Sequence, residues 1–205
     1  MSGSGFLGTP DPTPEAERLF EEDISDLGFV MNTSKLWAYQ ADTTADLFAL
    51  IRKTVSGQGL SVRHRSVLVV ACAAAMEDSY CSLVWGGRLA DATDPETAGG
   101  VLRGDDSGLT PAEQALAAWA RKVVGDPSRT TRHDVQELRD AGWTDAQIFA
   151  ITTFVALRMA FSTVNDALGA LPDSAYRSLT PRPVLDAVTY GRPIADGDQP
   201  AEPVA

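Results

Sequence analysis

Three helix-start motifs organise the second half of the chain, at residues 110–113, 131–134 and 144–147. In each motif a threonine precedes an acidic residue or a glutamine by three positions. The two side chains of such a capping box satisfy backbone N–H groups that the first helical turn leaves free. Pro111 also occupies the first helical position, where proline is favoured. We therefore expect three helices to begin at these points, the last running to Leu168.

Helical spacing of apolar residues also covers the first half. A helix over residues 15–26 is expected to end at Gly28, and a helix over residues 61–85 begins with Ser61 as N-cap. The middle of this second helix is apolar on every side, which predicts burial by its neighbours, and residues 86–87, both glycine, are expected to weaken or end it. Because the alternating pattern of half-buried strands is missing, we predict an all-α fold. Further helical segments are expected over residues 34–55 and 95–102.

Size and charge limit the organisation and the partners. The chain has 205 residues, of which 44% are hydrophobic, so it can bury one core. We predict one helical domain over residues 15–190, with mobile tails at residues 1–14 and 191–205 that are rich in Pro, Gly and Asp. A net charge of -11 with no basic cluster argues against nucleic acid as a partner.

Membrane and export signals are weak. The longest apolar run, residues 67–76, is half of the roughly 20 residues that cross a bilayer. The first residues contain neither a basic segment nor a long apolar segment of a secretory signal. We therefore expect no membrane partner and a cytoplasmic location.

Cysteine and histidine are scarce. Cys72 and Cys81 lie nine positions apart in the expected helix 61–85, which places them on opposite faces and prevents a disulfide. With only His64 and His133 besides, a metal site is not expected, and no glycine-rich phosphate loop follows a strand. We expect no cofactor.

Several motifs resemble the alkylhydroperoxidase-D-like and carboxymuconolactone decarboxylase superfamily, in particular its peroxidase-related branch. The segment Asp78-Ser79-Tyr80-Cys81 stands where that superfamily carries Cys-x-x-Cys. Residues 28–32, 142–148 and 164–169 resemble further segments of the family. The resemblance implies a single-domain helical bundle of the alkylhydroperoxidase-D-like type, a small-molecule substrate or ligand, and assembly into homo-oligomers.

The family's redox relay uses one Glu, two Cys and two His. The corresponding residues here retain a single member of the relay, the cysteine that the family uses to attack peroxide; they are Ser66, Asp78, Tyr80, Cys81 and Trp85. The resemblance therefore implies a degenerate Cys-x-x-Cys motif whose two-cysteine peroxidase relay is lost.

The residues around Cys81 are the candidate site. In a continuous helix, Asp78, Cys81 and Trp85 share one side, and Glu77 also reaches Cys81. The two carboxylates disfavour a thiolate. We expect Asp78, Tyr80 and Cys81 to be catalytic, with a packing role as the alternative for each, and Arg158 to pair with Asp78. The expected pocket-lining residues are Ser66, Glu77, Trp85 and Arg158.

Three functions remain open. The first is a cofactor-free enzyme with Asp78 as general acid or base, Tyr80 as hydrogen-bond donor and Cys81 as a polar or nucleophilic contact on a small organic molecule. The second is a one-cysteine hydroperoxidase in which an external thiol resolves the oxidised Cys81. The third is a non-catalytic ligand-binding or assembly protein, for which we expect a closed cavity filled by side chains.

Overall fold

The computed structural model describes residues 5–197, which form helices and no strand. The predicted all-α class is confirmed. The helices of the described part are α1 (Pro14–Leu27), α2 (Asn32–Trp37), α3 (Ala41–Val55), α4 (Val62–Ala75), α5 (Ser79–Ala92), α6 (Pro95–Leu102), α7 (Pro111–Gly125), α8 (Arg132–Asp140), α9 (Asp145–Ala167), α10 (Tyr176–Leu179) and α11 (Arg182–Ala187), with 3-10 turns η1 (Ala38–Gln40) and η2 (Pro127–Arg129).

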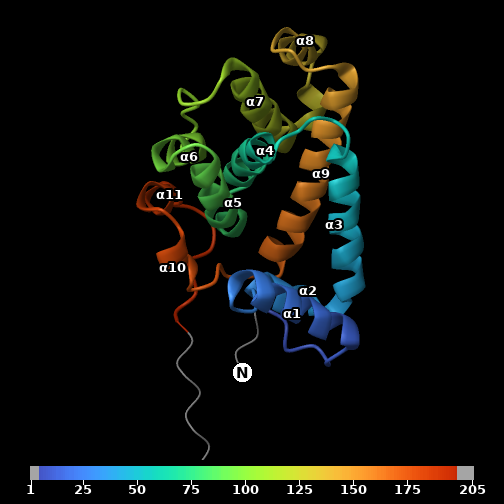
Figure 1. Cartoon of the computed structure of the whole chain (residues 1–205), viewed down its shortest axis with the longest axis vertical. Coiled ribbons are helices and arrows are strands. Elements are labelled where there is room, and N and C mark those ends of the chain that lie inside the picture. The colour runs from blue at the N-terminus through green and yellow to red at the C-terminus, as the bar shows by residue number, and fades with distance from the viewer. Residues whose placement is uncertain (1–4, 198–205) are drawn as a thin grey trace, which may run out of the picture.

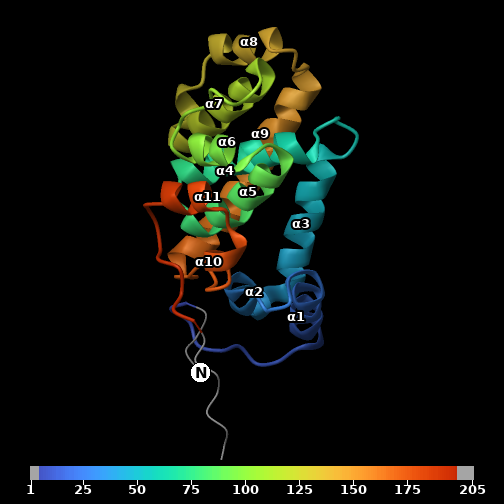
Figure 2. The ribbon, with the colours of Figure 1, turned by 60° about the vertical axis from the view of Figure 1, so that its left-hand side comes forward.

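Helix α4 is the centre of the bundle (Figure 1). It packs against α5, α7 and α9, and its residues from Ser66 to Ala73 are buried on every face, as its continuous apolar pattern predicts. Helix α3 runs beside α9, while α1 and α2 cross one end of that pair (Figures 1 and 2). Helices α5, α3 and α9, together with α1 and α2, surround the cavity described below.

The capping motifs act as predicted. The side chains of Ser61, Thr110, Thr131 and Thr144 each accept a hydrogen bond from a backbone N–H in the first turn of the following helix. Gly28 ends α1 in the left-handed conformation, with φ 82°. These helix ends were predictable because each depends on residues within one or two turns.

The prediction of one helix over residues 61–85 is wrong. Helix α4 ends at Ala75, because Glu77 adopts a left-handed conformation with φ 57° and the N–H of Asp78 donates to the carbonyl of Ala73. This is the Schellman ending, in which a glycine usually occupies the left-handed position. Asp78 then serves as N-cap of α5. Cys72 and Cys81 therefore belong to different helices, and both are free thiols.

The possible helix end at residues 86–87 is also wrong, since α5 continues to Ala92. A Cβ atom on Gly86 would lie 2.5 Å from Cγ1 of Val184, whereas one on Gly87 would meet nothing within 4 Å. Gly86 thus lets α11 approach α5 closely, and this tertiary contact explains why a glycine occupies the middle of the helix.

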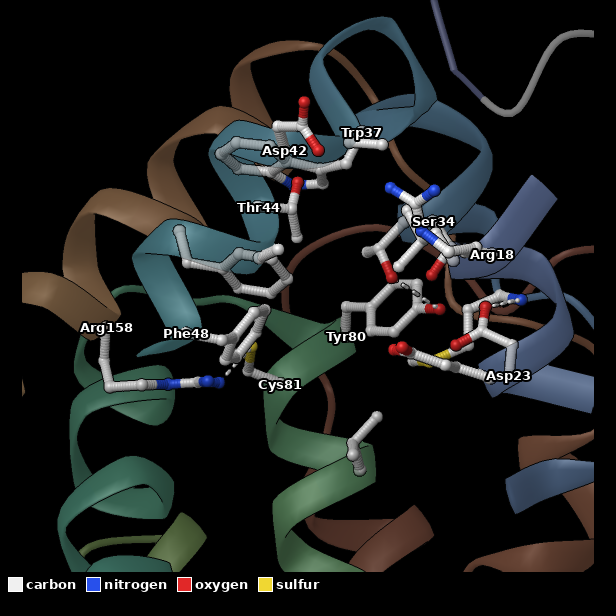
Figure 3. A pocket seen from close by; sticks show the side chains of 18 of the residues that line it. Arg18, Asp23, Ser34, Trp37, Asp42, Thr44, Phe48, Tyr80, Cys81 and Arg158 are labelled. Atoms are coloured by element: carbon white, nitrogen blue, oxygen red, sulfur yellow. Dashed lines mark hydrogen bonds between the residues drawn. The ribbon is translucent and has the colours of Figure 1, made fainter. Parts of the chain in front are cut away.

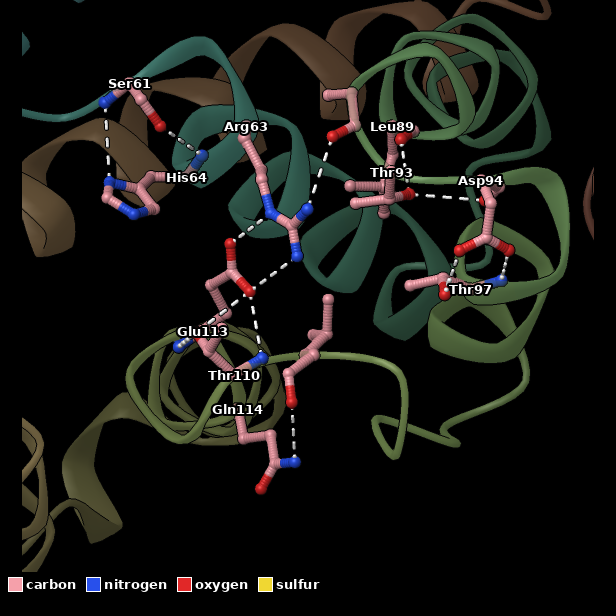
Figure 4. Close-up of polar contacts among 12 residues, drawn as sticks. Ser61, Arg63, His64, Leu89, Thr93, Asp94, Thr97, Thr110, Glu113 and Gln114 are labelled. Carbon is pink, nitrogen blue, oxygen red and sulfur yellow. Dashed lines mark hydrogen bonds and ion pairs between the residues drawn. The ribbon is translucent and has the colours of Figure 1, made fainter.

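One ion pair, together with a hydrogen bond to a backbone carbonyl, joins helices α4, α7 and α5 (Figure 4). Arg63, in the first turn of α4, binds Glu113 of α7 through two hydrogen bonds, with Nη2 3.0 Å from Oε2. Its Nη1 donates to the carbonyl of Ala92 at the end of α5. Glu113 also accepts from the N–H of Thr110, so a single carboxylate caps α7 and holds α4.

The ends of the described chain contact the bundle. The N–H of Phe6 donates to the carbonyl of Leu168 at 2.8 Å, and the N–H of Ala195 donates to Pro172 at 2.8 Å. The guanidinium of Arg192 lies 4.8 Å from the Phe6 ring. The expectation of mobile tails stays a prediction, and part of it falls on residues 1–4 and 198–205, which lie outside the described residues.

Helix α9 is long and apolar enough to meet the length and composition criteria for a membrane span, with 44% of its most apolar window buried in the bundle. Its contacts with α3, α4, α7 and α8 are those of a core helix in a compact helical fold.

Candidate functional site

A cavity of about 400 Å³ lies between α1–α3 on one side and α5 and α9 on the other (Figure 3). Its deep part is formed by buried residues and aromatic rings, among them Cys81, Arg158 and Phe161, while exposed charged residues form its rim. The residues lining it are Glu15, Arg18, Leu19, Glu22, Asp23, Met31, Thr33, Ser34, Trp37, Ala41, Asp42, Thr44, Ala45, Phe48, Arg52, Tyr80, Cys81, Val84, Trp85, Arg88, Arg158 and Phe161.

Cys81 occupies the third position of α5. Its backbone N–H donates to Oδ1 of Asp78 at 2.9 Å, so the N-cap holds the residue in place. Its sulfur accepts hydrogen bonds from Arg158, whose Nη2 lies 3.4 Å away, and from the hydroxyl of Ser162 at 3.7 Å. Both donors come from α9. The thiol is thus held between the start of one helix and the middle of another.

Arg158 is a buried cation, with 3% of its surface exposed. Its guanidinium carbon lies 5.2 Å from the centre of the Trp85 ring, 5.3 Å from Phe161 and 5.8 Å from Phe48. Figure 3 shows the guanidinium, Phe48 and Cys81 together at one side of the cavity. Aromatic faces attract cations, and the attraction is stronger away from water.

Burial raises the pKa of the Cys81 thiol far above its ordinary value, and the carboxylate of Asp78 raises it further. The positive charge of Arg158 and the hydroxyl of Ser162 oppose these effects. Burial also raises the pKa of Cys72, to about 12. Both thiols are therefore protonated at neutral pH, but only Cys81 lines the cavity and has a cation on its sulfur.

Tyr80 directs its hydroxyl to a second buried carboxylate. The hydroxyl donates to Asp173, in the segment after α9, and accepts from Thr33 at 3.3 Å. Asp173 also accepts from the N–H of Asn32 at 2.9 Å, and burial raises the pKa of its carboxyl group. The Tyr80 proton is thus committed to Asp173, so its predicted role as a donor to substrate is not supported by this geometry.

The structure brings Tyr80, Cys81, Trp85 and Arg158 together around one cavity. The other three predicted residues do not line this cavity: Ser66 is fully buried in α4, Glu77 is exposed at the break between α4 and α5, and Asp78 lies beneath Cys81 as a cap.

The expected pairing of Arg158 with Asp78 is also wrong. Within residues 5–197 no ion pair joins them, and Arg158 contacts the Cys81 sulfur instead. Oδ2 of Asp78 is buried with no hydrogen-bond partner in the described part of the chain.

Sequence reasoning missed several lining residues. Arg88 follows Trp85 by three positions on α5, and Phe161 follows Arg158 by three positions on α9, spacings that place each pair on one helix face. That spacing was an available signal. No local signal indicated Asp173, which meets Tyr80 only through the path of the chain after α9. Among the described residues, no group of three or more His, Cys, Asp or Glu side chains is arranged to hold a metal ion.

No protein-family model matches the chain, and no curated protein matches it. Its structure is similar to that of a peroxidase-related protein from Silicibacter sp. TM1040 whose function is uncharacterized, with 20% identity, a TM-score of 0.76, and coverage of 85% of this chain and 95% of the other. A second uncharacterized peroxidase-related protein, from Ralstonia eutropha JMP134, described as an alkylhydroperoxidase AhpD core, has 21% identity, a TM-score of 0.71, and coverage of 86% and 96%.

A third similar structure is that of the debrominase Bmp8, in a variant with one cysteine replaced by alanine, in complex with 2,3,4-tribromopyrrole. It has 17% identity, a TM-score of 0.69, and coverage of 92% of this chain and 98% of the other. At these identities the likeness concerns the fold. The predicted helical bundle of the alkylhydroperoxidase-D-like type is confirmed.

Proposed function

We propose that the protein is a cofactor-free enzyme that acts on a small organic molecule through the thiol of Cys81. The observation that carries this proposal is the contact between the Cys81 sulfur and the Arg158 guanidinium at 3.4 Å, at the deep end of a cavity of about 400 Å³. A cavity of this size suits a compact organic ligand. Asp78 positions Cys81 in this proposal and no longer serves as general acid or base, because it caps α5 and does not line the cavity.

The chemistry follows from the surroundings of the thiol. A protonated thiol is a poor nucleophile, and a nearby cation lowers the cost of forming the thiolate. Arg158 supplies this cation, and Ser162 offers a hydroxyl proton to the sulfur. In the proposed step, the sulfur bonds to an electrophilic carbon of the substrate, the bond from that carbon to its leaving group breaks, and the thiol proton passes to the leaving group. Water then cleaves the bond between that carbon and the sulfur, which returns the free thiol. The step therefore needs no external oxidant or reductant.

The structural comparison supports the choice of ligand size and reacting residue. One protein of this fold is a debrominase, and its structure holds a small brominated ring compound in a variant from which a cysteine was removed. A ring of that size is compatible with the aromatic surroundings of Cys81. This likeness suggests halogenated rings as first substrates to try.

The reactivity of Cys81 can be tested against Cys72, which is equally buried but lies in the core. We expect iodoacetamide to label Cys81 faster than Cys72 in the folded protein and both at similar rates in urea, as followed by mass spectrometry. Arg158→Met should slow the labelling of Cys81 more than that of Cys72, because the Arg158 charge lowers the pKa of both thiols but its guanidinium contacts only the Cys81 sulfur. Equal labelling of the two cysteines in the folded protein would contradict the proposal.

Catalytic turnover is tested in a second experiment. The protein and its Cys81→Ala variant are incubated with small ring compounds that carry halogen, ester or lactone groups. We expect product, or a covalent adduct on Cys81, with the unmodified protein alone. Products formed equally by Cys81→Ala would assign the chemistry to another residue.

A one-cysteine hydroperoxidase is the second candidate, favoured by the likeness to peroxidase-related proteins and by the cation on the sulfur. The thiolate would attack the peroxide to give a sulfenic acid and an alcohol, and an external thiol would reduce the sulfenic acid. Dimedone trapping after addition of stoichiometric peroxide tests it, with Cys81 as the expected site. The raised pKa of the Cys81 thiol disfavours the thiolate in this candidate as it does in the first.

For the third alternative, a non-catalytic ligand-binding or assembly protein, we expected a closed cavity filled by side chains, and the cavity of about 400 Å³ argues against a filled interior. Homo-oligomer formation and a cytoplasmic location remain predictions. Size-exclusion chromatography with light scattering tests the first of them.

A further inference from the structure

Two of the arginines that line the cavity are Arg88 and Arg158. Within residues 5–197, neither takes part in an ion pair, although the protein carries a net charge of -11. Arg88 lies at the mouth of the cavity and Arg158 at its deep end. Exposed arginines need no partner, but a buried one is costly unless an anion compensates it.

Arg158 is the uncompensated case. It is 3% exposed, and its Nε atom is buried without any acceptor in the described part of the protein. The hydrogen bond that its guanidinium makes there goes to the Cys81 sulfur, which is uncharged as a thiol. An arginine keeps its charge in proteins and offers five N–H donors in a planar fork. Most of these donors have no acceptor among the described residues.

Arg88 places a second positive charge near Arg158, on the other contact of the Trp85 side chain. The Trp85 ring lies between the two arginines, 4.6 Å from the guanidinium carbon of Arg88 and 5.2 Å from that of Arg158. Burial lowers the pKa of Arg88, and the charge of Arg158 lowers it further. Two like charges that repel each other across one ring would both be stabilised by a bound anion.

The acidic residues that line the cavity belong to α1 and α3, not to the helices that carry Arg88 and Arg158. Glu15, Glu22 and Asp23 belong to α1, and Asp42 begins α3. Figure 3 shows Asp23 and Asp42 on the side away from Arg158. Beside Arg158 the walls are aromatic, with Phe161 stacked on Trp37 at 5.5 Å and in edge contact with Phe48 at 5.0 Å.

We propose that the cavity binds an organic anion consisting of an aromatic ring with a carboxylate group, the carboxylate on Arg158 and the ring among Trp37, Phe48 and Phe161. The planar guanidinium fork matches a carboxylate through two parallel hydrogen bonds. This assignment deepens the proposed function by naming its substrate class, and it rests on that proposal only for the place of the ligand. In this arrangement the ring lies close to the Cys81 sulfur.

Calorimetric titration of the unmodified protein with benzoate and with its neutral isostere benzamide tests the proposal. We expect benzoate to bind at least about tenfold more tightly, as a charge-assisted contact of about 1.5 kcal/mol or more implies. Equal affinity, or no binding of benzoate at millimolar concentration, would overturn the proposal. This comparison needs no variant, so it decides the question even where a substitution at Arg158 prevents folding.

Variants then locate the contact. Arg158→Met should remove the preference for benzoate, and Arg158→Lys should retain part of it. Arg132→Met, on the exposed face of α8, removes the same charge far from the cavity and should leave both affinities unchanged. Unchanged benzoate binding by a folded Arg158→Met variant would contradict the assignment.

The same titration with Cys81→Ala separates the two proposals. We expect this variant to retain the preference for benzoate, because the anion site does not need the sulfur. If benzoate binds preferentially but Cys81 of the unmodified protein does not react, the proposed chemistry alone is refuted. If Cys81 reacts but the protein binds benzoate no more tightly than benzamide, the anion site alone is refuted.

Discussion

Asp78 holds Cys81 by its backbone, with Oδ1 of the carboxylate 2.9 Å from the Cys81 nitrogen. The same carboxylate raises the pKa of the Cys81 thiol, while Arg158 lowers it from the other side. Asp78 therefore has two separable effects, one on the stability of α5 and one on the reactivity of the sulfur.

Asp78→Asn separates these effects. Asparagine is as good an N-cap as aspartate, so the fold should be retained, while loss of the negative charge should lower the pKa of Cys81. We expect the pH profile of Cys81 alkylation to move to lower pH. Asp91→Asn, an exposed change on the same helix, should not move it. Asp78→Ala should cost about 0.5–2 kcal/mol of unfolding free energy by loss of the cap. An unmoved profile in Asp78→Asn would contradict the electrostatic role.

The ion pair of Arg63 and Glu113 predicts a loss of stability in acid. The hydrogen bonds from Arg63 lower the pKa of Glu113 from 4.5 to about 2. A carboxyl whose pKa is depressed by folding stabilises the fold above its unfolded pKa, and this contribution disappears as the pH falls from 4.5 towards about 2.

Glu113→Gln should therefore lower the free energy of unfolding by roughly 2 kcal/mol at neutral pH and by less in acid. Glutamine can still complete the capping box with Thr110, so the change reports on the charge. Urea unfolding at neutral pH and in acid measures this difference in the free energy of unfolding, with Glu137→Gln, a change of an exposed residue, as control. A loss of stability that is equal at both pH values would argue against the ion pair as its source.

Adjacent glycines in α5 should respond in opposite directions. Gly86→Ala forces a methyl group to within 2.5 Å of Val184, and we expect it to lower the free energy of unfolding by about 1–3 kcal/mol. Gly87→Ala meets no atom within 4 Å and should raise it by about 0.5–1 kcal/mol, because alanine favours helix. Thermal unfolding of both variants checks the pair, and equal shifts would contradict the close approach of α11.

Tyr80→Phe removes a donor to the buried carboxylate of Asp173. That hydrogen bond lowers the pKa of Asp173 against the larger effect of burial, so its loss should raise this pKa further. A carboxyl whose pKa is raised by folding costs stability as the pH rises, so the loss should be larger at neutral pH than at about pH 4.

We expect Tyr80→Phe to lower the free energy of unfolding by about 1–3 kcal/mol at neutral pH, as measured by urea unfolding. Tyr39→Phe is the matched control, because the Tyr39 side chain is exposed. A cost of the same size for both variants would show that the contact with Asp173 contributes nothing.

Much of the fold could be predicted because helix ends are local. Thr110, Thr131 and Thr144 cap helices through backbone groups three residues away, and the amino-acid types alone indicate this. The break between α4 and α5 was missed because Glu77, in a left-handed conformation, replaces the glycine that normally marks such an ending. Asp78 was interpreted as a catalytic carboxylate although aspartate is also a preferred N-cap.

The sequence by itself determined the helical class, most helix starts and the segment that carries Tyr80, Cys81 and Trp85, since these depend on residues within a few turns. Only the tertiary structure decided which group meets the thiol. Arg158 lies 77 positions after Cys81, and its choice of sulfur over the Asp78 carboxylate depends on how α9 packs beside α5. Local sequence patterns do not encode distances between separate helices, because packing of the whole core sets those distances.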